Sequence, residues 1–172
     1  FRMLGSEVTV VEAMDSVLPI FDKEIRRPLE ISIKKQKITT HLGVFAKGVE
    51  KAKDGRTQLN FIDKNEKDES KMQNVVVDKV LVTVGRKPNS AALGPTGVAL
   101  DERGFVKVND RCETNMRGVY AIGDVCDSGE MLAHVASFQG EMVAEIIAGH
   151  KRAYDPVAVP AIVFTEPEIV SV

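Results

Sequence analysis

Short apolar runs rich in β-branched residues recur along the chain and predict buried strands. The clearest of them are residues 7–11, 79–84 and 118–122. Each run is too short for a typical helix and is followed directly by a glycine or an acidic residue. Continuous apolar strands of this kind are typical of parallel sheets whose two faces are both covered. We therefore expect these three segments to lie in a parallel sheet.

Two segments have the periodicity of helices. Residues 22–35 carry isoleucine and leucine at approximately helical spacing, and Asp22 is a candidate N-cap. Residues 131–148 follow a loop and form the longest helical stretch, which Gly149 is expected to stop. The sequence thus predicts two helices.

A different pattern, of short strands separated by turns, is typical of antiparallel pairing. Asp54-Gly55 predicts a hairpin turn, and the polar residues 63–71 predict an exposed loop. Residues 154–160 are punctuated by proline and predict a linker. The short strands expected in this way are residues 42–49, 58–62, 74–77, 105–108, 161–164 and 169–172. Buried strands, helices and an antiparallel meander together predict an α/β fold in three layers.

The composition is that of a globular protein and excludes several classes. Of the 172 residues, 44% are hydrophobic and 28% charged, and the net charge of -2 offers no basic surface to nucleic acid. No apolar run approaches the roughly 20 residues that span a membrane. The chain begins with Phe1, so we expect its natural N-terminus to lie further upstream. Cys112 and Cys126 have no redox or metal spacing, which favours two reduced thiols and leaves a bridge open.

Glu12 follows the first buried run directly. An acidic residue at this point of a dinucleotide-binding unit accepts hydrogen bonds from the adenosine ribose. Its charge also repels a 2′-phosphate and so favours NAD over NADP. The glycine-rich loop that accompanies such a residue would lie before Phe1, and a simple solvated carboxylate is the alternative.

Gly85 ends the second buried run and is followed by Arg86. A glycine at a strand end permits close approach of a ligand to the backbone, and an arginine there can bind phosphate or form an ion pair. The alternative is a Gly-Arg turn that merely leaves the sheet.

Asp124 comes one residue after the end of the third buried run. That edge of an open α/β sheet is where ligands bind, and a carboxylate there can bond the ribityl hydroxyls of a flavin. It favours a pyrophosphate only if another group offsets the like charges, and the helix that begins near Met131 offers its positive end. His134 at the same end is either a site residue or an ordinary helix residue.

Together these motifs resemble those of the pyridine nucleotide-disulfide oxidoreductase family. They occur along the chain in the same order as in that family and with about the same spacing. The resemblance runs over essentially the whole chain, and residues 131–134 are most similar to the dihydrolipoamide dehydrogenase branch. The motifs are Thr9-Val10-Val11-Glu12, Val84-Gly85-Arg86-Lys87-Pro88-Asn89, Ala121-Ile122-Gly123-Asp124, Met131-Leu132-Ala133-His134, Val159-Pro160 and Phe164-Thr165-Glu166-Pro167-Glu168.

The resemblance implies an incomplete FAD/NAD(P)-binding Rossmann-like domain with the start of an α+β interface domain. Residues 1–115 would form an NAD-binding domain that lacks its first strand and Gly-rich loop, residues 116–152 a returning segment of the FAD domain, and residues 153–172 a linker and the start of the interface domain. The implied cofactor-binding residues are Glu12, Ala46, Gly85, Asp124, Met131, Leu132, Ala133 and His134.

For the full-length protein the resemblance implies oxidation of dihydrolipoamide and reduction of NAD+ through FAD. It also implies a homodimer that serves lipoyl-bearing proteins of 2-oxo acid dehydrogenase or glycine cleavage complexes, in the cytoplasm or, in a eukaryote, the mitochondrial matrix. No residue is assigned a catalytic role, because the family's redox cysteine pair and His-Glu pair have no match here. We therefore expect this chain alone to be inactive. The alternatives are a piece of a glutathione or mercuric reductase type of enzyme and a non-enzymatic nucleotide-binding scaffold.

Overall fold

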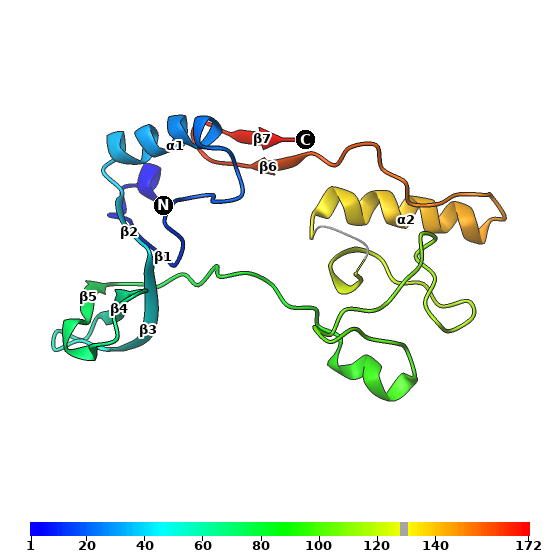
Figure 1. The fold of residues 1–172 in the computed structure, drawn as a ribbon, viewed down its shortest axis with the longest axis horizontal. Coiled ribbons are helices and arrows are strands. Elements are labelled where there is room, and N and C mark those ends of the chain that lie inside the picture. The colour runs from blue at the N-terminus through cyan, green and yellow to red at the C-terminus, as the bar shows by residue number, and fades with distance from the viewer. Residues whose placement is uncertain (128–130) are drawn as a thin grey trace. The chain divides into compact units, whose positions relative to one another are not determined.

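The computed structural model describes residues 1–127 and 131–172 (Figure 1). Residues 128–130 of the loop expected before the second helix lie outside the described residues. The chain forms two compact units, one of Phe1–Thr83 with Ile162–Ser171 and one of Val84–Ala161 with Val172, called unit 1 and unit 2 below. Among the described helices, none is long and apolar enough to cross a bilayer.

The division between the units falls after Thr83, whereas the resemblance places a domain change after residue 115. Residues 84–115 are therefore compact with the segment that follows them. The assignment of residues 1–115, 116–152 and 153–172 to NAD, FAD and interface domains stays a prediction.

Unit 1 contains two sheets, one long helix and part of a strand pair. β1 and β2 are parallel, with Thr9 opposite Thr39 and Glu12 opposite Leu42. β3, β4 and β5 form an antiparallel meander in that order. The elements are η1 (Arg2–Leu4), β1 (Thr9–Glu12), α1 (Lys23–Lys35), β2 (Thr39–Leu42), β3 (Val44–Lys51), β4 (Thr57–Asp63), η2 (Glu69–Lys71), β5 (Gln73–Val77), β6 (Ala161–Val163) and β7 (Ile169–Ser171). The predicted meander is confirmed. The first apolar run does lie in a parallel pair, but its partner is β2 rather than either of the other two runs.

Gly43 divides what the sequence predicts as one strand into β2 and β3. Its backbone has a φ of 67°, and a methyl group added there would lie 2.9 Å from Asp15 Oδ1. The Gly43 N–H donates to the Met14 carbonyl and its own carbonyl accepts from Lys64. A side chain is therefore excluded here, and the glycine lets the chain pass from the parallel pair into the meander.

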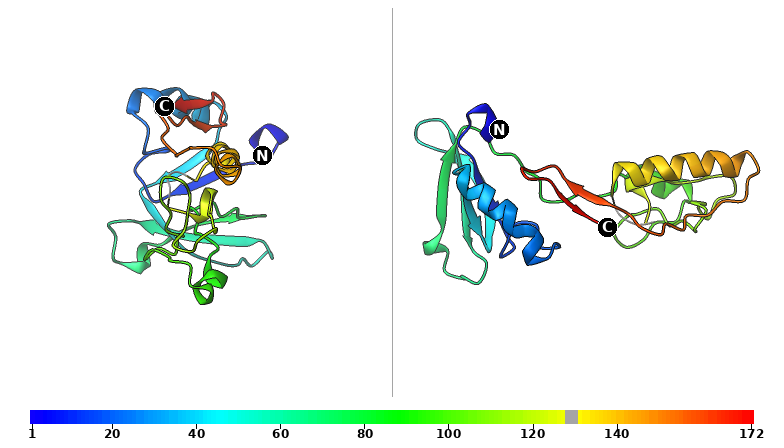
Figure 2. Two further views of the ribbon diagram at one scale, coloured as in Figure 1. Left: turned by 90° about the vertical axis from the view of Figure 1, so that its right-hand side faces the viewer. Right: turned by 90° about the horizontal axis from the view of Figure 1, so that it is seen from above.

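The helix α1 packs its apolar side against β7 (Figure 2). Leu29 is the buried residue of the helix, and it lies in one cluster with Phe21 and Ile169. Asp22 takes the N-cap position as expected, but its side chain makes no capping hydrogen bond. The helix is thus stabilised by its buried side rather than by a cap.

The core of the meander lies under β4. Phe61 and Ile62 are 1% and 2% exposed, and the Phe61 ring lies 4.6 Å from the His41 ring of β2. The register of β3 shifts between Ala46 and Gly48, which marks a β-bulge. Phe61 therefore joins the parallel pair to the meander.

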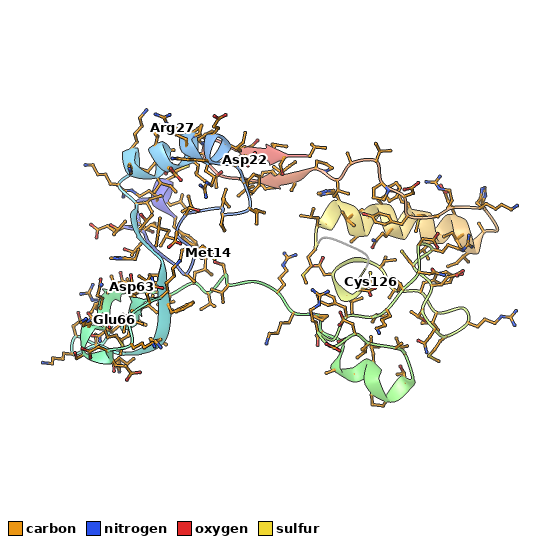
Figure 3. All side chains as sticks on the ribbon, viewed as in Figure 1. Met14, Asp22, Arg27, Asp63, Glu66 and Cys126 are labelled. Carbon is orange, nitrogen blue, oxygen red and sulfur yellow. The ribbon has the colours of Figure 1, made fainter. Side chains whose placement is uncertain are left out.

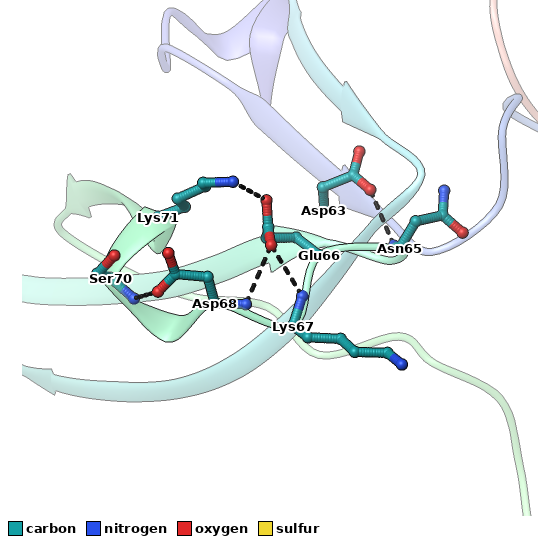
Figure 4. Close-up of polar contacts among 7 residues, drawn as sticks. All are labelled: Asp63, Asn65, Glu66, Lys67, Asp68, Ser70 and Lys71. Atoms are coloured by element: carbon teal, nitrogen blue, oxygen red, sulfur yellow. Dashed lines mark hydrogen bonds and ion pairs between the residues drawn. The ribbon is translucent and has the colours of Figure 1, made fainter.

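The polar loop expected after β4 is held by its own side chains (Figure 4). Glu66 accepts from the N–H groups of Lys67 and Asp68 and pairs with Lys71 at 2.6 Å. The bond from Lys71 lowers the pKa of the Glu66 carboxyl, with help from the Asp68 N–H. Asp68 likewise accepts from the Ser70 N–H. The loop is exposed, as predicted, but it is locally ordered.

The described part of unit 2 is built around one long helix. Its regular elements are η3 (Ala91–Thr96), η4 (Gly123–Val125) and α2 (Ala133–Ile147). Cys112, Met142, Val143 and Ile146 form its buried cluster. The helix ends at Ile147, and Gly149, two residues further on, has a φ of 95°. The N–H groups of Gly149 and His150 bond the carbonyls of Ile146 and Glu145, a Schellman motif that confirms the predicted stop.

Residues 79–84 are not a strand, contrary to the sequence-based expectation. Among the described residues no strand pairs with them, and Leu81 and Val84 are 69% and 89% exposed. An extended segment needs a neighbour that takes up its backbone hydrogen bonds. The apolar run indicates a tendency to be buried, but it does not show which strand, if any, pairs with residues 79–84.

Residues 105–108 and 118–122 form isolated bridges instead of the expected strands. Val106 pairs with Leu100 and Cys126, and Tyr120 pairs with Glu113. Left-handed backbone conformations flank these contacts, at Cys112, Gly118 and Gly123. The chain bends away after each bridge, so no ladder of hydrogen bonds develops.

Replacing Phe61 by alanine should destabilise unit 1 by about 3–5 kcal/mol, since it removes a fully buried ring and leaves a cavity. Phe45→Ala on the adjacent strand is the matched control, because this ring is 49% exposed and should cost about 1 kcal/mol or less. Urea unfolding followed by circular dichroism measures both variants. Equal losses would contradict the placement of the core.

Candidate functional site

Glu12 closes β1 at its carboxyl end, where the sequence predicts a ribose-binding group. Its Oε1 accepts a hydrogen bond of 2.8 Å from the backbone N–H of Met14, which is labelled in Figure 3. Within the described part of the chain, Oε2 has no hydrogen-bond partner. The side chain is partly buried. One carboxylate oxygen is therefore fixed by the loop and the other remains able to accept from a ligand.

The loop after β1 is anchored by an ion pair. Asp15 Oδ2 lies 2.5 Å from Lys64 Nζ, at the end of β4. The Gly43 N–H also donates to the Met14 carbonyl at 2.9 Å, which ties the loop to the β2–β3 junction. Ala46, another predicted site residue, lies exposed on β3 opposite Phe61, and β3 contacts β1. Glu12 and Ala46 thus belong to neighbouring strands of unit 1.

The other six predicted site residues lie in unit 2, and a single arginine joins two of them. Arg86 Nη1 donates to Asp124 Oδ2 at 2.8 Å and to the Met131 carbonyl at 3.2 Å. The Asp124 carboxylate belongs to η4, and Met131 leads into α2. Three separate segments therefore meet at one guanidinium group.

Gly123 determines where Asp124 lies. Its φ is 68°, and a methyl group added to it would lie 2.8 Å from the Ala136 Cβ atom of α2. Its N–H donates at 2.7 Å to Gln139 Oε1, an amide that is fully buried. On the next turn of the helix Gly140 lies under Ile122, which is 3.4 Å from a Cβ atom placed there. The turn that carries Asp124 is consequently fixed to the side of α2.

The remaining predicted residues are accessible. Gly85 is exposed, with a φ of 96° and open space where a side chain would be. Ala133 and His134, in the first turn of α2, are exposed, while Met131 and Leu132 are partly buried. Leu132 occupies the N-cap position of α2, and its apolar side chain makes no hydrogen bond to the first N–H groups of the helix.

The cysteines are structural thiols within unit 2. Cys112 is fully buried, and Cys126 donates from its thiol to the Gly123 carbonyl at 3.1 Å. Burial raises the pKa of the Cys112 thiol to about 11, and the Cys126 sulfur adds to this effect. Both are reduced in the structure. In the described residues, no group of histidine, cysteine and acidic side chains could hold a metal ion.

Two supporting residues were not expected from the sequence. Gln139 and Gly140 lie in the middle of a predicted helix, where a polar side chain normally faces solvent and a glycine weakens the helix. A glutamine on the apolar side of this helix was the available signal. Its partner, the Gly123 N–H, could be identified only from the structure.

Gly123→Ala should destabilise unit 2 and displace Asp124, because it combines backbone strain with a clash against Ala136. Gly118→Ala is the matched control, since Gly118 has a φ of 77° but open space around it. Strain alone should cost about 1–2 kcal/mol, and overpacking should add about 1–3 kcal/mol at Gly123. Urea unfolding of both variants tests this, and equal losses would refute the close approach to α2.

The stability of unit 2 should fall in alkaline solution. Because the Cys112 pKa is raised from 9.0 to about 11 on folding, its contribution is complete below pH 9 and is lost as the pH rises through 11. Urea unfolding at several pH values from 8 to 11 should show this decline. The Cys112→Ala variant should decline less steeply, and an identical slope would contradict the assignment.

Comparison with known proteins identifies the family. The model of the family "pyridine nucleotide-disulphide oxidoreductase" matches residues 1–140. The dihydrolipoyl dehydrogenases of Bacillus subtilis and Pseudomonas aeruginosa are 40% and 42% identical to this chain, over 100% and 99% of it and 36% and 35% of their own lengths. The structure resembles that of the HOCl-induced flavoprotein disulfide reductase RclA of Escherichia coli, solved as a Cu(II) complex, with a TM-score of 0.83. The two sequences are 26% identical, and the match covers 98% of this chain and 38% of RclA. The chain thus spans about 36% of the length of the B. subtilis relative. It belongs to the pyridine nucleotide-disulphide oxidoreductase family.

Proposed function

We propose that this chain is part of a flavoprotein that oxidises dihydrolipoamide and reduces NAD+ through FAD. The observation that carries the proposal is the meeting of Arg86, Asp124 and the start of α2 in unit 2. Similarity to dihydrolipoyl dehydrogenases over the whole chain supports the choice of substrate.

The residues of unit 2 fit a flavin dinucleotide in their chemistry. The Asp124 carboxylate is 46% exposed and can accept hydrogen bonds from ribityl hydroxyls. Arg86 brings a positive charge to the same place, which suits a pyrophosphate. Gly85 leaves its backbone open, and Ala133 and His134 lie exposed at the first turn of α2. When bound, FAD would supply the two-electron chemistry, and these residues would bind and orient it.

Unit 1 fits the adenosine end of NAD. The Glu12 carboxylate has one oxygen fixed by the Met14 N–H and one able to accept from a ribose hydroxyl. The charge of Glu12 disfavours a 2′-phosphate. Ala46 on the neighbouring β3 is proposed as an edge of the adenine site. We therefore propose NAD rather than NADP.

The lipoyl-bearing proteins of 2-oxo acid dehydrogenase or glycine cleavage complexes are the proposed partners, and the full-length protein is proposed to be a homodimer. The proposed location is the cytoplasm, or the mitochondrial matrix in a eukaryote. A second candidate is a disulfide reductase with another substrate, which the structural similarity to RclA favours. An assay of the intact protein with dihydrolipoamide and NAD+, set against glutathione disulfide or mercuric ion with a reduced nicotinamide cofactor, separates the two.

Glu12→Ala in the intact protein should raise the KM for NAD+ about tenfold to a hundredfold, because a hydrogen bond to a charged group contributes about 1.5–3 kcal/mol. Discrimination against NADP+ should fall at the same time. Glu7→Ala is the matched control, since Glu7 is exposed and precedes the same strand. Steady-state kinetics with both nucleotides measures the effect. An unchanged KM for NAD+ in Glu12→Ala would remove Glu12 from the site.

A further inference from the structure

The loop that follows β1 holds the carboxylate of Glu12 through its backbone. The Met14 N–H donates to Glu12 Oε1 at 2.8 Å, and the Met14 carbonyl accepts from the Gly43 N–H at 2.9 Å. Met14 is therefore bonded on one side to the proposed ribose-binding group and on the other to the β2–β3 junction. A displacement of Met14 would break one of these bonds and release the Glu12 carboxylate.

Lys64, the residue after β4, is bonded to the same junction and to the same loop. Its N–H donates to the Gly43 carbonyl at 2.8 Å, and its Nζ atom lies 2.5 Å from Asp15 Oδ2. A Cβ atom at Gly43 would lie 4.0 Å from Lys64 Cε and 2.9 Å from Asp15 Oδ1. Gly43 thus leaves room for both side chains, and the lysine reaches the loop across a residue that has none.

Lys64 is the less mobile partner of this ion pair. Its side chain is 29% exposed, whereas that of Asp15 is 79% exposed. An ion pair between two solvated side chains contributes little, because solvent screens the charges and both side chains lose freedom. A lysine whose alkyl stem is already packed has less freedom to lose. The pair therefore provides a fixed point for the loop rather than a large gain in stability.

Three consecutive residues of the loop are held by three different parts of unit 1. Met14 is held by the β2–β3 junction and Asp15 by Lys64. Ser16 accepts a hydrogen bond from Nη1 of Arg26, which belongs to α1. Of the two side chains that hold the loop, Lys64 is the one bonded next to Met14. The position of the loop next to Glu12 is thus determined by residues far away in the sequence.

We propose that Lys64 is a positioning residue for NAD, which acts through Asp15 and Met14 on the carboxylate of Glu12. The inference rests on the proposed function, because it takes Glu12 as the ribose-binding group. Lys64 keeps the Met14 N–H on Oε1 of Glu12, so that Oε2 stays directed towards a ribose hydroxyl. The lysine itself needs no contact with the nucleotide.

The test measures the affinity of the intact protein for NAD+ by titration calorimetry, which does not depend on turnover. Steady-state kinetics with dihydrolipoamide adds the KM for NAD+ and kcat. The variants are Lys64→Met, Asp15→Asn, the exchange variant Asp15→Lys/Lys64→Asp, Glu12→Ala and the double variant Glu12→Ala/Lys64→Met. Lys71→Met is the matched control, since Lys71 forms an ion pair of 2.6 Å with Glu66 in the neighbouring polar loop. Urea unfolding reports whether each variant is folded.

Lys64→Met should raise the Kd and the KM for NAD+ about threefold to tenfold and leave kcat unchanged, as expected for the loss of one coupled contact. Asp15→Asn should act in the same direction, and it carries the test if Lys64→Met does not fold. The exchange variant should recover part of the affinity, because it forms the pair again with the charges reversed. In the Glu12→Ala background, Lys64→Met should have no further effect, since Lys64 acts only through Glu12. Lys71→Met should bind NAD+ as the wild type does.

Two results would overturn the inference while Glu12 keeps its proposed role. They are an unchanged Kd for NAD+ in Lys64→Met and Asp15→Asn, and a further loss of affinity when Lys64→Met is added to Glu12→Ala. A fall in kcat as large as the rise in KM would also overturn it, since a general structural defect has that effect. A wild type that binds no NAD+ would overturn both the inference and the proposed function. A wild type that binds NAD+ but does not oxidise dihydrolipoamide would overturn only the proposed substrate.

Discussion

The close approach of Gly123 to α2 is the contact on which the arrangement of unit 2 depends. No side chain fits between this residue and Ala136, and its N–H donates to the buried amide of Gln139. The Gly123 N–H and the buried Gln139 Oε1 satisfy each other, and a buried polar group that loses a hydrogen bond is costly. The turn can therefore occupy only one position along the helix.

The exposed side chains of the site follow from this buried contact. Asp124 is the next residue after Gly123, so its carboxylate is directed by a backbone that has little freedom. Arg86 reaches it from a segment with no regular structure of its own. The position of Asp124, held by the Gly123 turn, thus determines where Arg86 pairs. A surface ion pair that would be weak between two mobile side chains gains geometric precision in this way.

The sequence predicts local elements better than it predicts their neighbours. The helices at 22–35 and 131–148, the meander and the stop at Gly149 follow from periodicity and turn residues, and all are present. Residues 79–84 have the composition of a buried strand, but no described strand pairs with them. Composition reports how well a segment suits a sheet, whereas pairing depends on distant residues.

The same distinction explains which site residues the sequence could indicate. Glu12 and Asp124 each follow an apolar run, and a residue in that position can be recognised from the sequence alone. Gln139 supports the site from 16 residues away along the chain, and nothing in its own neighbourhood points to Gly123. Residues that would face a ligand are thus found by their place in a motif, while the residues that orient them are found only by contact. For this chain, the sequence motifs indicate Glu12 and Asp124. The structure adds the residues that orient Asp124, which are Gly123 and Gln139.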